Sequence, residues 1–352
     1  MQRKKKIALA LILSLTFSLL FLIFGAKPLS IEYQFTPNWN IDIQGASTND
    51  DENAVALPFR LGQTIGYFTS DGKIISRTTF PFRASISHSY FAPYNADAKN
   101  TDFFFPNETK CGTIAEAGFP FFDDERIYVF LPGGGAVAKY SASSNKIWQY
   151  SNTSPITAFS SSERGTVLGF ADGSVTVISH DGKITNEFSP GGSDFPIILG
   201  AALSQDAQMV ATISGRNPTR FSLTKKEGDA SKIIFHEFID DKMPTQEVVK
   251  FNKNCSHVYY GFTNTLGVLN IEKLKQRHIP LHGSLVSLKE SSGLIFALAK
   301  EQNTYTVYAI ESFDAVIASF SFTAEYAFIE TDESSLYVGK DSSISKIALS
   351  KK

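Results

Sequence analysis

The stretch GTVLGFADGSVTVISHDGKITNEF, residues 165–188, decides the fold class. It contains three short β-rich runs, 166–170, 174–179 and 184–188, which the tripeptides Ala-Asp-Gly and His-Asp-Gly separate. Asp-Gly between β-branched runs is a strong hairpin signal, because glycine adopts positive φ at no steric cost. With residues 155–159 before it, the stretch predicts four consecutive antiparallel strands, which are typical of one blade of a β-propeller.

The last hairpin of this unit recurs along the chain. Its clear copies are Ser70–Lys73, Ser144–Lys146 and His180–Lys183. With weaker copies the sequence contains seven such hairpins and a final incomplete unit, residues 323–350. We therefore expect an all-β chain in which residues 54–350 form a propeller of about eight four-stranded blades. Seven blades is the alternative, if residues 84–117 are an elaborated loop.

A propeller must close its ring, because otherwise two sheet edges stay open. A common solution pairs a strand from one terminus with an incomplete last blade. Residues 27–53 form a polar segment before the propeller, and the alternating run Ile31–Phe35 within it is the expected ring-closing strand.

The first 26 residues differ from the rest of the chain. Residues 1–6 include four consecutive basic side chains, and residues 7–26 contain no charge. About 20 apolar helical residues span the hydrocarbon core of a bilayer, and basic flanks stay on the cytoplasmic side. We expect residues 7–26 to be a transmembrane signal anchor that leaves the propeller outside the cytoplasm, on the periplasmic or extracellular side. The alternative is a cleaved signal peptide, which would release a secreted protein.

Composition narrows the classes of partner. The chain has 33 Lys and Arg against 35 Asp and Glu, and its formal net charge is −2 at pH 7. Because four of the basic residues precede the apolar run, the remainder is mildly acidic, and this argues against a nucleic-acid partner. The two cysteines, Cys111 and Cys255, fall in blades that we expect to lie apart on the ring, so we predict two free thiols.

Two segments carry a resemblance to a known family. Gly135–Tyr150 and Gly173–Phe188 resemble the quinoprotein-type repeat, in which a strand, a turn and Gly-Lys-x-x-Trp close each blade, and more loosely the WD-repeat superfamily. The tryptophan of the pattern stands once, at Trp148. Exported propellers of this type include a lipoprotein of the outer-membrane protein assembly machinery and the quinone-cofactor dehydrogenases. The resemblance therefore implies either a docking platform or a redox enzyme.

No convergent catalytic or metal-binding set can be recognised in the sequence. His278 and His282 are spaced as metal ligands can be, but no cysteine or carboxylate cluster adjoins them. Glycine-rich loops are the best candidates for ligand contact, since binding sites commonly lie on loops. These candidate residues are Gly133, Gly134, Gly135, Gly191, Gly192, Ser193 and Asp194. We predict no catalytic, cofactor-binding or metal-binding residue.

Together these features predict a membrane-anchored extracytoplasmic propeller that acts as a non-catalytic protein-binding or envelope-assembly platform. The expected partner is another protein of the cell envelope, the membrane is reached through the N-terminal helix, and no cofactor is expected. Two alternatives stay open: a propeller-type enzyme, such as a quinone-dependent oxidoreductase, and a structural envelope protein.

Overall fold

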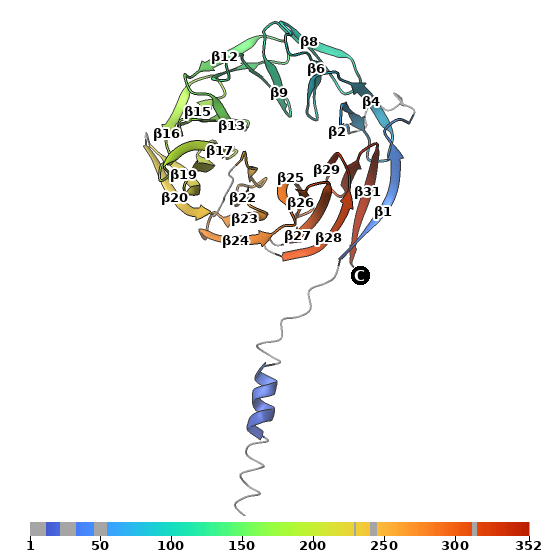
Figure 1. Ribbon diagram of the computed structural model, residues 1–352, viewed down its shortest axis with the longest axis vertical. Coiled ribbons are helices and arrows are strands. Elements are labelled where there is room, and N and C mark those ends of the chain that lie inside the picture. Colours follow the sequence, from blue (N-terminus) through green and yellow to red (C-terminus); the bar gives the residue numbers. More distant parts are fainter. Residues whose placement is uncertain are drawn as a thin grey trace, which may run out of the picture.

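The strands of this chain form eight antiparallel sheets, arranged like blades around a central axis (Figure 1). The computed structural model describes residues 12–21, 33–45, 55–228, 230–239, 245–311 and 315–351. In these residues seven sheets have four strands and one has three. The expected eight-bladed, all-β propeller is confirmed, and residues 84–117 belong to a blade rather than to an elaborated loop.

The blades are numbered here in chain order, and the strands of each blade run from the axis outward. Blade 1 contains β2 (Leu57–Leu61), β3 (Thr64–Phe68) and β4 (Ile74–Thr79). Blade 2 contains β5 (Arg83–Ile86), β6 (Phe91–Tyr94), β7 (Thr101–Phe104) and β8 (Lys110–Ile114). Blade 3 contains β9 (Phe119–Asp123), β10 (Arg126–Phe130), β11 (Ala136–Tyr140) and β12 (Lys146–Ser151). Blade 4 contains β13 (Ile156–Ser161), β14 (Gly165–Phe170), β15 (Val175–Ser179) and β16 (Ile184–Phe188).

The second half of the ring has the same plan. Blade 5 contains β17 (Phe195–Leu203), β18 (Met209–Arg216), β19 (Thr219–Glu227) and β20 (Ala230–Ile239). Blade 6 contains β21 (Val249–Phe251), β22 (His257–Phe262), β23 (Thr265–Asn270) and β24 (Lys275–Pro280). Blade 7 contains β25 (Ser284–Ser291), β26 (Leu294–Glu301), β27 (Thr304–Glu311) and β28 (Ala315–Thr323). Blade 8 contains β29 (Ala327–Thr331), β30 (Leu336–Lys340), β31 (Ser343–Lys351) and, from the other end of the chain, β1 (Tyr33–Asp42).

The first strand closes the ring as the outer strand of the last blade. β1 pairs with β31 in antiparallel register, with Trp39 opposite Lys346, and the two strands lie side by side in Figure 1. The expected ring-closing run, residues 31–35, overlaps the start of this strand, and its first two residues lie outside the described residues. The strand continues well beyond that run, since it pairs with β31 as far as Asp42. Trp39 packs against the ring of Tyr337 in the same blade (5.8 Å between centroids).

Blade 1 lacks, within the described residues, the inner strand that the other blades have. Residues 80–82 alone join β4 to β5, and a link of the same length joins the outer strand of blade 7 to the inner strand of blade 8. The amide of Phe80 donates to the carbonyl of Gln63 at 3.0 Å. The amide of Ala324 donates to Asn303 in the same way at 2.9 Å. β4 is therefore the outer strand of its blade, and β2 corresponds to the second strand of the others.

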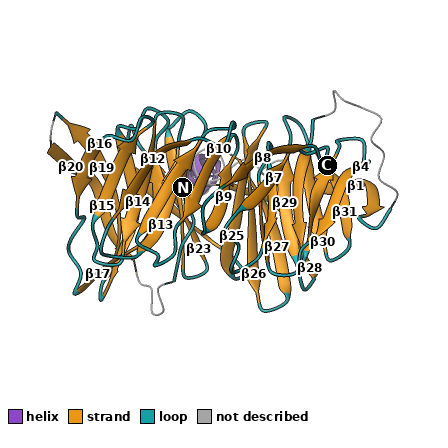
Figure 2. Ribbon diagram, turned by 90° about the horizontal axis from the view of Figure 1, so that it is seen from above, coloured by secondary structure: helices purple, strands orange, loops and turns teal. Residues whose placement is uncertain are grey.

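The propeller has two faces, seen edge-on in Figure 2. Because successive strands of a blade alternate in direction, the turns after the first and third strands lie on one face, which we call the front face. The turns after the second strands, and the links between blades, lie on the opposite face, which we call the rear face.

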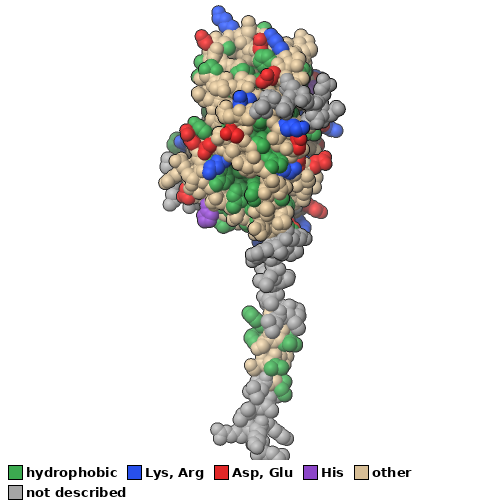
Figure 3. All heavy atoms as spheres, turned by 90° about the vertical axis from the view of Figure 1, so that its right-hand side faces the viewer, with side chains coloured by type: hydrophobic (Ala, Val, Ile, Leu, Met, Phe, Trp, Pro, Cys, Tyr) green, Lys and Arg blue, Asp and Glu red, His purple; other side chains and the backbone are tan. Residues whose placement is uncertain are grey.

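Residues 12–21 form a helix, whose apolar side chains are exposed (Figure 3). Among the helical residues that the structure describes, no segment is long and apolar enough to cross a membrane. The expected anchor comprises residues 7–26, and its other residues, 7–11 and 22–26, lie outside the described residues.

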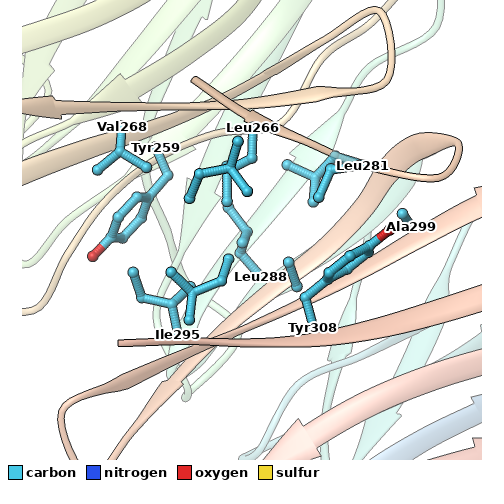
Figure 4. Close-up of a cluster of buried hydrophobic side chains, with 12 residues drawn as sticks. Tyr259, Leu266, Val268, Leu281, Leu288, Ile295, Ala299 and Tyr308 are labelled. Atoms are coloured by element: carbon cyan, nitrogen blue, oxygen red, sulfur yellow. The ribbon is translucent and has the colours of Figure 1, made fainter. Parts of the chain in front are cut away.

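The hydrophobic core lies between neighbouring blades. Figure 4 shows one cluster, in which Tyr259 and Leu266 of blade 6 face Leu288, Ile295 and Tyr308 of blade 7. All five side chains are buried. Aromatic and branched side chains suit this position, because they fill the space between two twisted sheets.

Two turn glycines show why Asp-Gly closes a blade here. Gly72 and Gly182 have φ of 87° and 89°, a region that favours glycine. A Cβ on Gly182 would lie 2.6 Å from the Cβ of Trp148, which belongs to the outer strand of the preceding blade. A Cβ on Gly72 would lie 3.2 Å from the ring of Trp39, which stands at the same place in β1. Each turn is therefore also a contact between blades.

Both cysteines are free thiols, as predicted. Cys111 lies in β8 of blade 2, and Cys255 lies in the turn between β21 and β22 of blade 6. Both side chains are partly buried, and burial raises the pKa of Cys111.

Candidate functional site: a central funnel

A cavity of about 960 Å³ lies at the axis of the propeller, and we call it the funnel. Blades 2 to 8 line it with the second half of their inner strands and with the turns that follow, while blade 1 lines it with β2. Since these turns belong to the front face, the funnel opens there. All eight blades thus contribute to one concave surface.

The first glycine-rich loop predicted from sequence lies on the rear face. Gly133, Gly134 and Gly135 are in the turn between β10 and β11, where the Ile156 amide donates to the carbonyl of Gly134 at 2.8 Å. This loop packs on the link to the next blade and does not line the funnel.

The second predicted loop, which contains Gly191, Gly192, Ser193 and Asp194, joins β16 to β17 on the same rear face. Its polar side chains bind the neighbouring turn of blade 5, where the Ser193 hydroxyl donates to the carbonyl of Pro218 at 2.5 Å. None of these residues lines the funnel. Ligand contact by either loop stays a prediction.

Equivalent positions on the inner strands carry three of the funnel's charges. The position in question lies two residues before the turn that follows the inner strand. It holds Lys250 in blade 6, Lys289 in blade 7 and Glu330 in blade 8. The same position holds Ser160 in blade 4 and Ala202 in blade 5. We call these five residues the tier. The Nζ of Lys289 lies 2.7 Å from Oε2 of Glu330, whose side chain is almost fully buried.

Among the three charged residues of the tier, Lys250 has no ion pair with any described residue. Its Nζ donates to the backbone carbonyl of Leu288 at 3.4 Å. The side chain is open to the water of the funnel, but protein surrounds it on several sides. This partial burial lowers the pKa of Lys250, and the positive charge of Lys289 lowers it further.

Asp123 and Arg126 flank the turn after the inner strand of blade 3. Their Oδ2 and Nη2 atoms lie 3.1 Å apart. The Nε of Arg126 donates to the hydroxyl of Ser161 at 2.8 Å, and that hydroxyl donates to Asp123. The three side chains satisfy one another and join blade 3 to blade 4.

His88, in the turn after β5, connects three blades. Its Nδ1 lies 3.3 Å from Oδ1 of Asp124 in blade 3, and its Nε2 lies 3.9 Å from Oε1 of Glu330 in blade 8. The hydrogen bond from His88 holds the pKa of Asp124 below its usual value. Because blade 1 lacks an inner strand in the described chain, His88 ties together the blades on either side of the shortened one.

One wall of the funnel is aromatic. Phe121, which takes the tier position in blade 3, is 41% exposed, and its ring meets Phe159 of blade 4 edge to face at 5.3 Å. Apolar and charged groups therefore line the same cavity, which is typical of a site that binds a polar ligand carrying apolar parts.

The histidines and tryptophans that the sequence singled out lie outside this cavity. In the described ranges, no group of three or more His, Cys, Asp and Glu side chains could hold an ion. His278, on the outer strand β24, pairs with Glu237 at 3.1 Å, and His282 lies in the link to blade 7. Trp39 and Trp148, which could stack on a cofactor, lie on outer strands away from the funnel.

The funnel residues escaped prediction from the sequence. They come from eight separate segments of the sequence, and only the arrangement of all the blades around one axis brings them together. One signal was present: a charged residue stands two positions before the turn in three consecutive repeats, at Lys250, Lys289 and Glu330.

Several solved structures share this fold. The chain is similar to BamB from Moraxella catarrhalis, with a TM-score of 0.62 and 10% identity over 90% of this chain and 100% of that chain. It is similar to the computationally designed Ika8 protein, with a TM-score of 0.60 and 12% identity over 84% of this chain and 97% of that chain. It is also similar to a chain of the mitotic checkpoint complex, with a TM-score of 0.55 and 12% identity over 92% of this chain and 94% of that chain. At these identities the similarity shows the fold alone.

Sequence comparison gives the family. An uncharacterized protein of Treponema pallidum (strain Nichols) is 29% identical over 349 residues, which cover 95% of this chain and 93% of the relative. A family model described as beta-propeller protein matches residues 1–352. Since that match spans the sequence from end to end, the chain belongs to this family of β-propeller proteins.

Proposed function

We propose that this chain is a membrane-anchored extracytoplasmic propeller, which acts as a non-catalytic platform for another protein of the cell envelope. The front face is the surface that it uses. The observation that carries the proposal is the funnel, an open cavity of about 960 Å³ at which all eight blades meet. Its volume lies at the upper end of ordinary ligand pockets, so it has room for a side chain cluster or an extended segment of a partner.

The composition of the funnel wall supports a protein partner. The exposed ring of Phe121 and the side chain of Arg126 both line the funnel, and aromatic and arginine side chains are enriched at protein interfaces. Arg126 is held by Asp123 and Ser161, as Lys289 is held by Glu330. Side chains fixed in this way lose little freedom when a partner binds, which favours affinity.

Two likenesses point in the same direction. The quinoprotein-type repeat that the chain resembles occurs in an exported lipoprotein of a protein-assembly machinery. One structural neighbour is a chain from the crystal structure of a protein complex, the mitotic checkpoint complex.

The location outside the cytoplasm rests on the sequence of the N-terminus. Residues 3–6 are basic and residues 7–26 are uncharged, as in a signal anchor. If residues 7–26 remain attached, the protein should resist extraction with carbonate, and N-terminal sequencing should begin at or near Met1. A sequence beginning near Lys27 would show a cleaved signal peptide instead.

The platform is tested by co-purification of the full chain from detergent-solubilised envelopes. The double variant Glu163→Lys/Glu333→Lys reverses two exposed carboxylates in turns of the front face. Asp97→Lys, in the exposed turn between β6 and β7 on the rear face, is the control. We expect one protein to co-purify reproducibly with the wild type and the control, and its recovery to change by about tenfold with the double variant, since both substitutions reverse charges in the lining of the funnel.

Two outcomes would count against the platform. One is the lack of any reproducible partner in several mild detergents. The other is an equal loss of the partner in the double variant and in Asp97→Lys, because it would show that the front face has no special part in binding.

A further inference from the structure

We propose that the funnel binds a carboxylate presented by the partner protein, and that Lys250 is the residue that pairs with it. This inference rests on the proposed function, and it names the chemical group that the platform recognises.

The charges of the tier do not balance. Two ammonium groups, those of Lys250 and Lys289 on neighbouring inner strands, face one carboxylate, that of Glu330. Lys289 holds that carboxylate at 2.7 Å. Lys250 is left with the carbonyl of Leu288 at 3.4 Å. An ammonium group with a neutral acceptor and a like charge nearby is stabilised by an incoming anion.

The other carboxylates around Lys250 are held by other donors. Asp123 is paired with Arg126 at 3.1 Å and also accepts the hydroxyl of Ser161. Glu290 accepts the backbone amide of Lys253 at 3.2 Å. In the described chain neither carboxylate forms an ion pair with Lys250, although Glu330, Glu290 and Asp123 favour its charged form from a greater distance. Its ammonium group can therefore still pair directly with a ligand.

Small side chains on the inner strands of blades 4 and 5 leave room for that ligand. The tier residues of the two preceding blades are Ala202 and Ser160. Ser162, also in the funnel wall, is 7% exposed, and among the described atoms its hydroxyl has no hydrogen-bond partner. Buried hydroxyl groups normally have such a partner, so this unpaired hydroxyl is an unusual feature of the wall.

The shape of the cavity favours an acidic residue within a polypeptide over a small free anion. A volume of about 960 Å³ far exceeds what one anion fills. The rings of Phe121 and Phe159, on the inner strands of blades 3 and 4, also line the wall, and they suit the apolar groups that flank an acidic residue in a peptide.

The test uses isotope-labelled lysine NMR of the full chain in detergent, with three probes. These are acetyl-Gly-Gly-Glu-Gly-Gly-amide, the same peptide with Gln in place of Glu, and inorganic phosphate. The signal of Lys250 is assigned by its loss in Lys250→Met. We expect the Glu peptide to shift this signal saturably, and the Gln peptide and phosphate to bind at least about tenfold more weakly.

Binding of the Glu peptide should also weaken by about tenfold or more in Lys250→Met. The matched control is Lys183→Met, which removes an exposed lysine in the turn between β15 and β16 on the same face, and its affinity should equal that of the wild type. Equal binding of the Glu and Gln peptides, or equal affinity in Lys250→Met and the wild type, would overturn the inference. Phosphate binding tighter than the Glu peptide would also overturn it, because the ligand would then be a free anion.

The failure of this inference can be told from failure of the platform. If the envelope partner co-purifies equally with the wild type and with Lys250→Met, the platform stands and the assignment of Lys250 is wrong. If no partner co-purifies with either, the proposed function itself fails.

Discussion

Lys250 lines the funnel and is open to its water on one side, yet no carboxylate of the described residues forms an ion pair with it. A charge in such a place opposes folding, because the hydration that it loses outweighs the attraction of the more distant carboxylates of Glu330, Glu290 and Asp123. Lys289, one blade further on, has the same position and avoids this cost through Glu330. Natural proteins keep such unfavourable groups where binding needs them, so stability and function should respond in opposite ways to a change at Lys250.

We expect Lys250→Met to raise the free energy of unfolding at pH 7, by less than about 1 kcal/mol because the funnel is open to water. The pKa of Lys250 is lower in the folded than in the unfolded chain, so the unfolded chain binds this proton more tightly. The wild type therefore gains stability as the pH rises through the folded pKa towards about 10, and the advantage of the variant shrinks.

Urea denaturation of both proteins at pH 7 and pH 10 measures this difference. Lys183→Met serves as the control, and we expect it to leave stability nearly unchanged, because Lys183 is 81% exposed. A Lys250→Met protein less stable than the wild type at pH 7 would mean that Lys250 makes a stabilising contact.

At the scale of strands and turns, what could be predicted from sequence was local. Asp-Gly turns identified the repeats, because positive φ at Gly72 and Gly182 is a property of the turn itself. The equivalence of Trp39 and Trp148, which both contact the turn glycine of the following blade, was not predicted. The Gly-Lys-x-x-Trp pattern needs a hairpin that is continuous in the chain, whereas the two outer strands of blade 8 come from opposite ends of the sequence.

The three-stranded blade escaped prediction for a related reason. The hairpin at residues 70–73 marks only the two outer strands of a blade. No comparable turn in the sequence tells whether the run before them is a first or a second strand. The short link at residues 80–82 shows that β4 is an outer strand. Three residues can join an outer strand to the next inner strand on the same face, but they are too few to cross from one face of the propeller to the other.

The turn glycines give a prediction at this scale. We expect Gly182→Ala to destabilise the protein by about 2–4 kcal/mol, because it adds a Cβ at 2.6 Å from Trp148 to the strain of a left-handed residue. Gly133→Ala is the control: φ is 96° there, but nothing lies within 4 Å of the added Cβ. It should cost only the backbone strain, about 1–2 kcal/mol.

Thermal and urea unfolding of these two variants separates the contact between blades from the turn conformation. Equal losses in Gly182→Ala and Gly133→Ala would mean that Trp148 moves aside without cost, and that the turn makes no contribution to the packing of the blades.

At the scale of the whole molecule, the funnel and the ring closure are long-range features. No window of the sequence contains the funnel, because each blade supplies one short piece of its wall. The fold class could be inferred because the repeat is local, and the site could not because it depends on the relative position of all blades. The pairing of β1 with β31 fixes that position, since it holds the first and last described strands in one sheet.

This pairing can be locked by a disulfide. Asn40 and Ser345 are opposite each other in β1 and β31, their side chains are 3.0 Å apart, and 305 residues separate them in the sequence. We expect Asn40→Cys/Ser345→Cys, in a background with Cys111 and Cys255 changed to Ser, to raise the free energy of unfolding by up to about 5 kcal/mol when oxidised. The gain comes from the unfolded chain, whose freedom a bridge across so long a loop restricts strongly.

The matched control is Thr176→Cys/Glu187→Cys, which joins the two outer strands of blade 4 across only 11 residues. The shorter loop predicts roughly half the gain, about 2–3 kcal/mol. Urea unfolding of each oxidised protein against its reduced form gives both values. A gain at the ring closure no larger than that in blade 4 would contradict the argument from loop length, and would mean that the bridge strains the native pairing of β1 with β31 by as much as it restricts the unfolded chain.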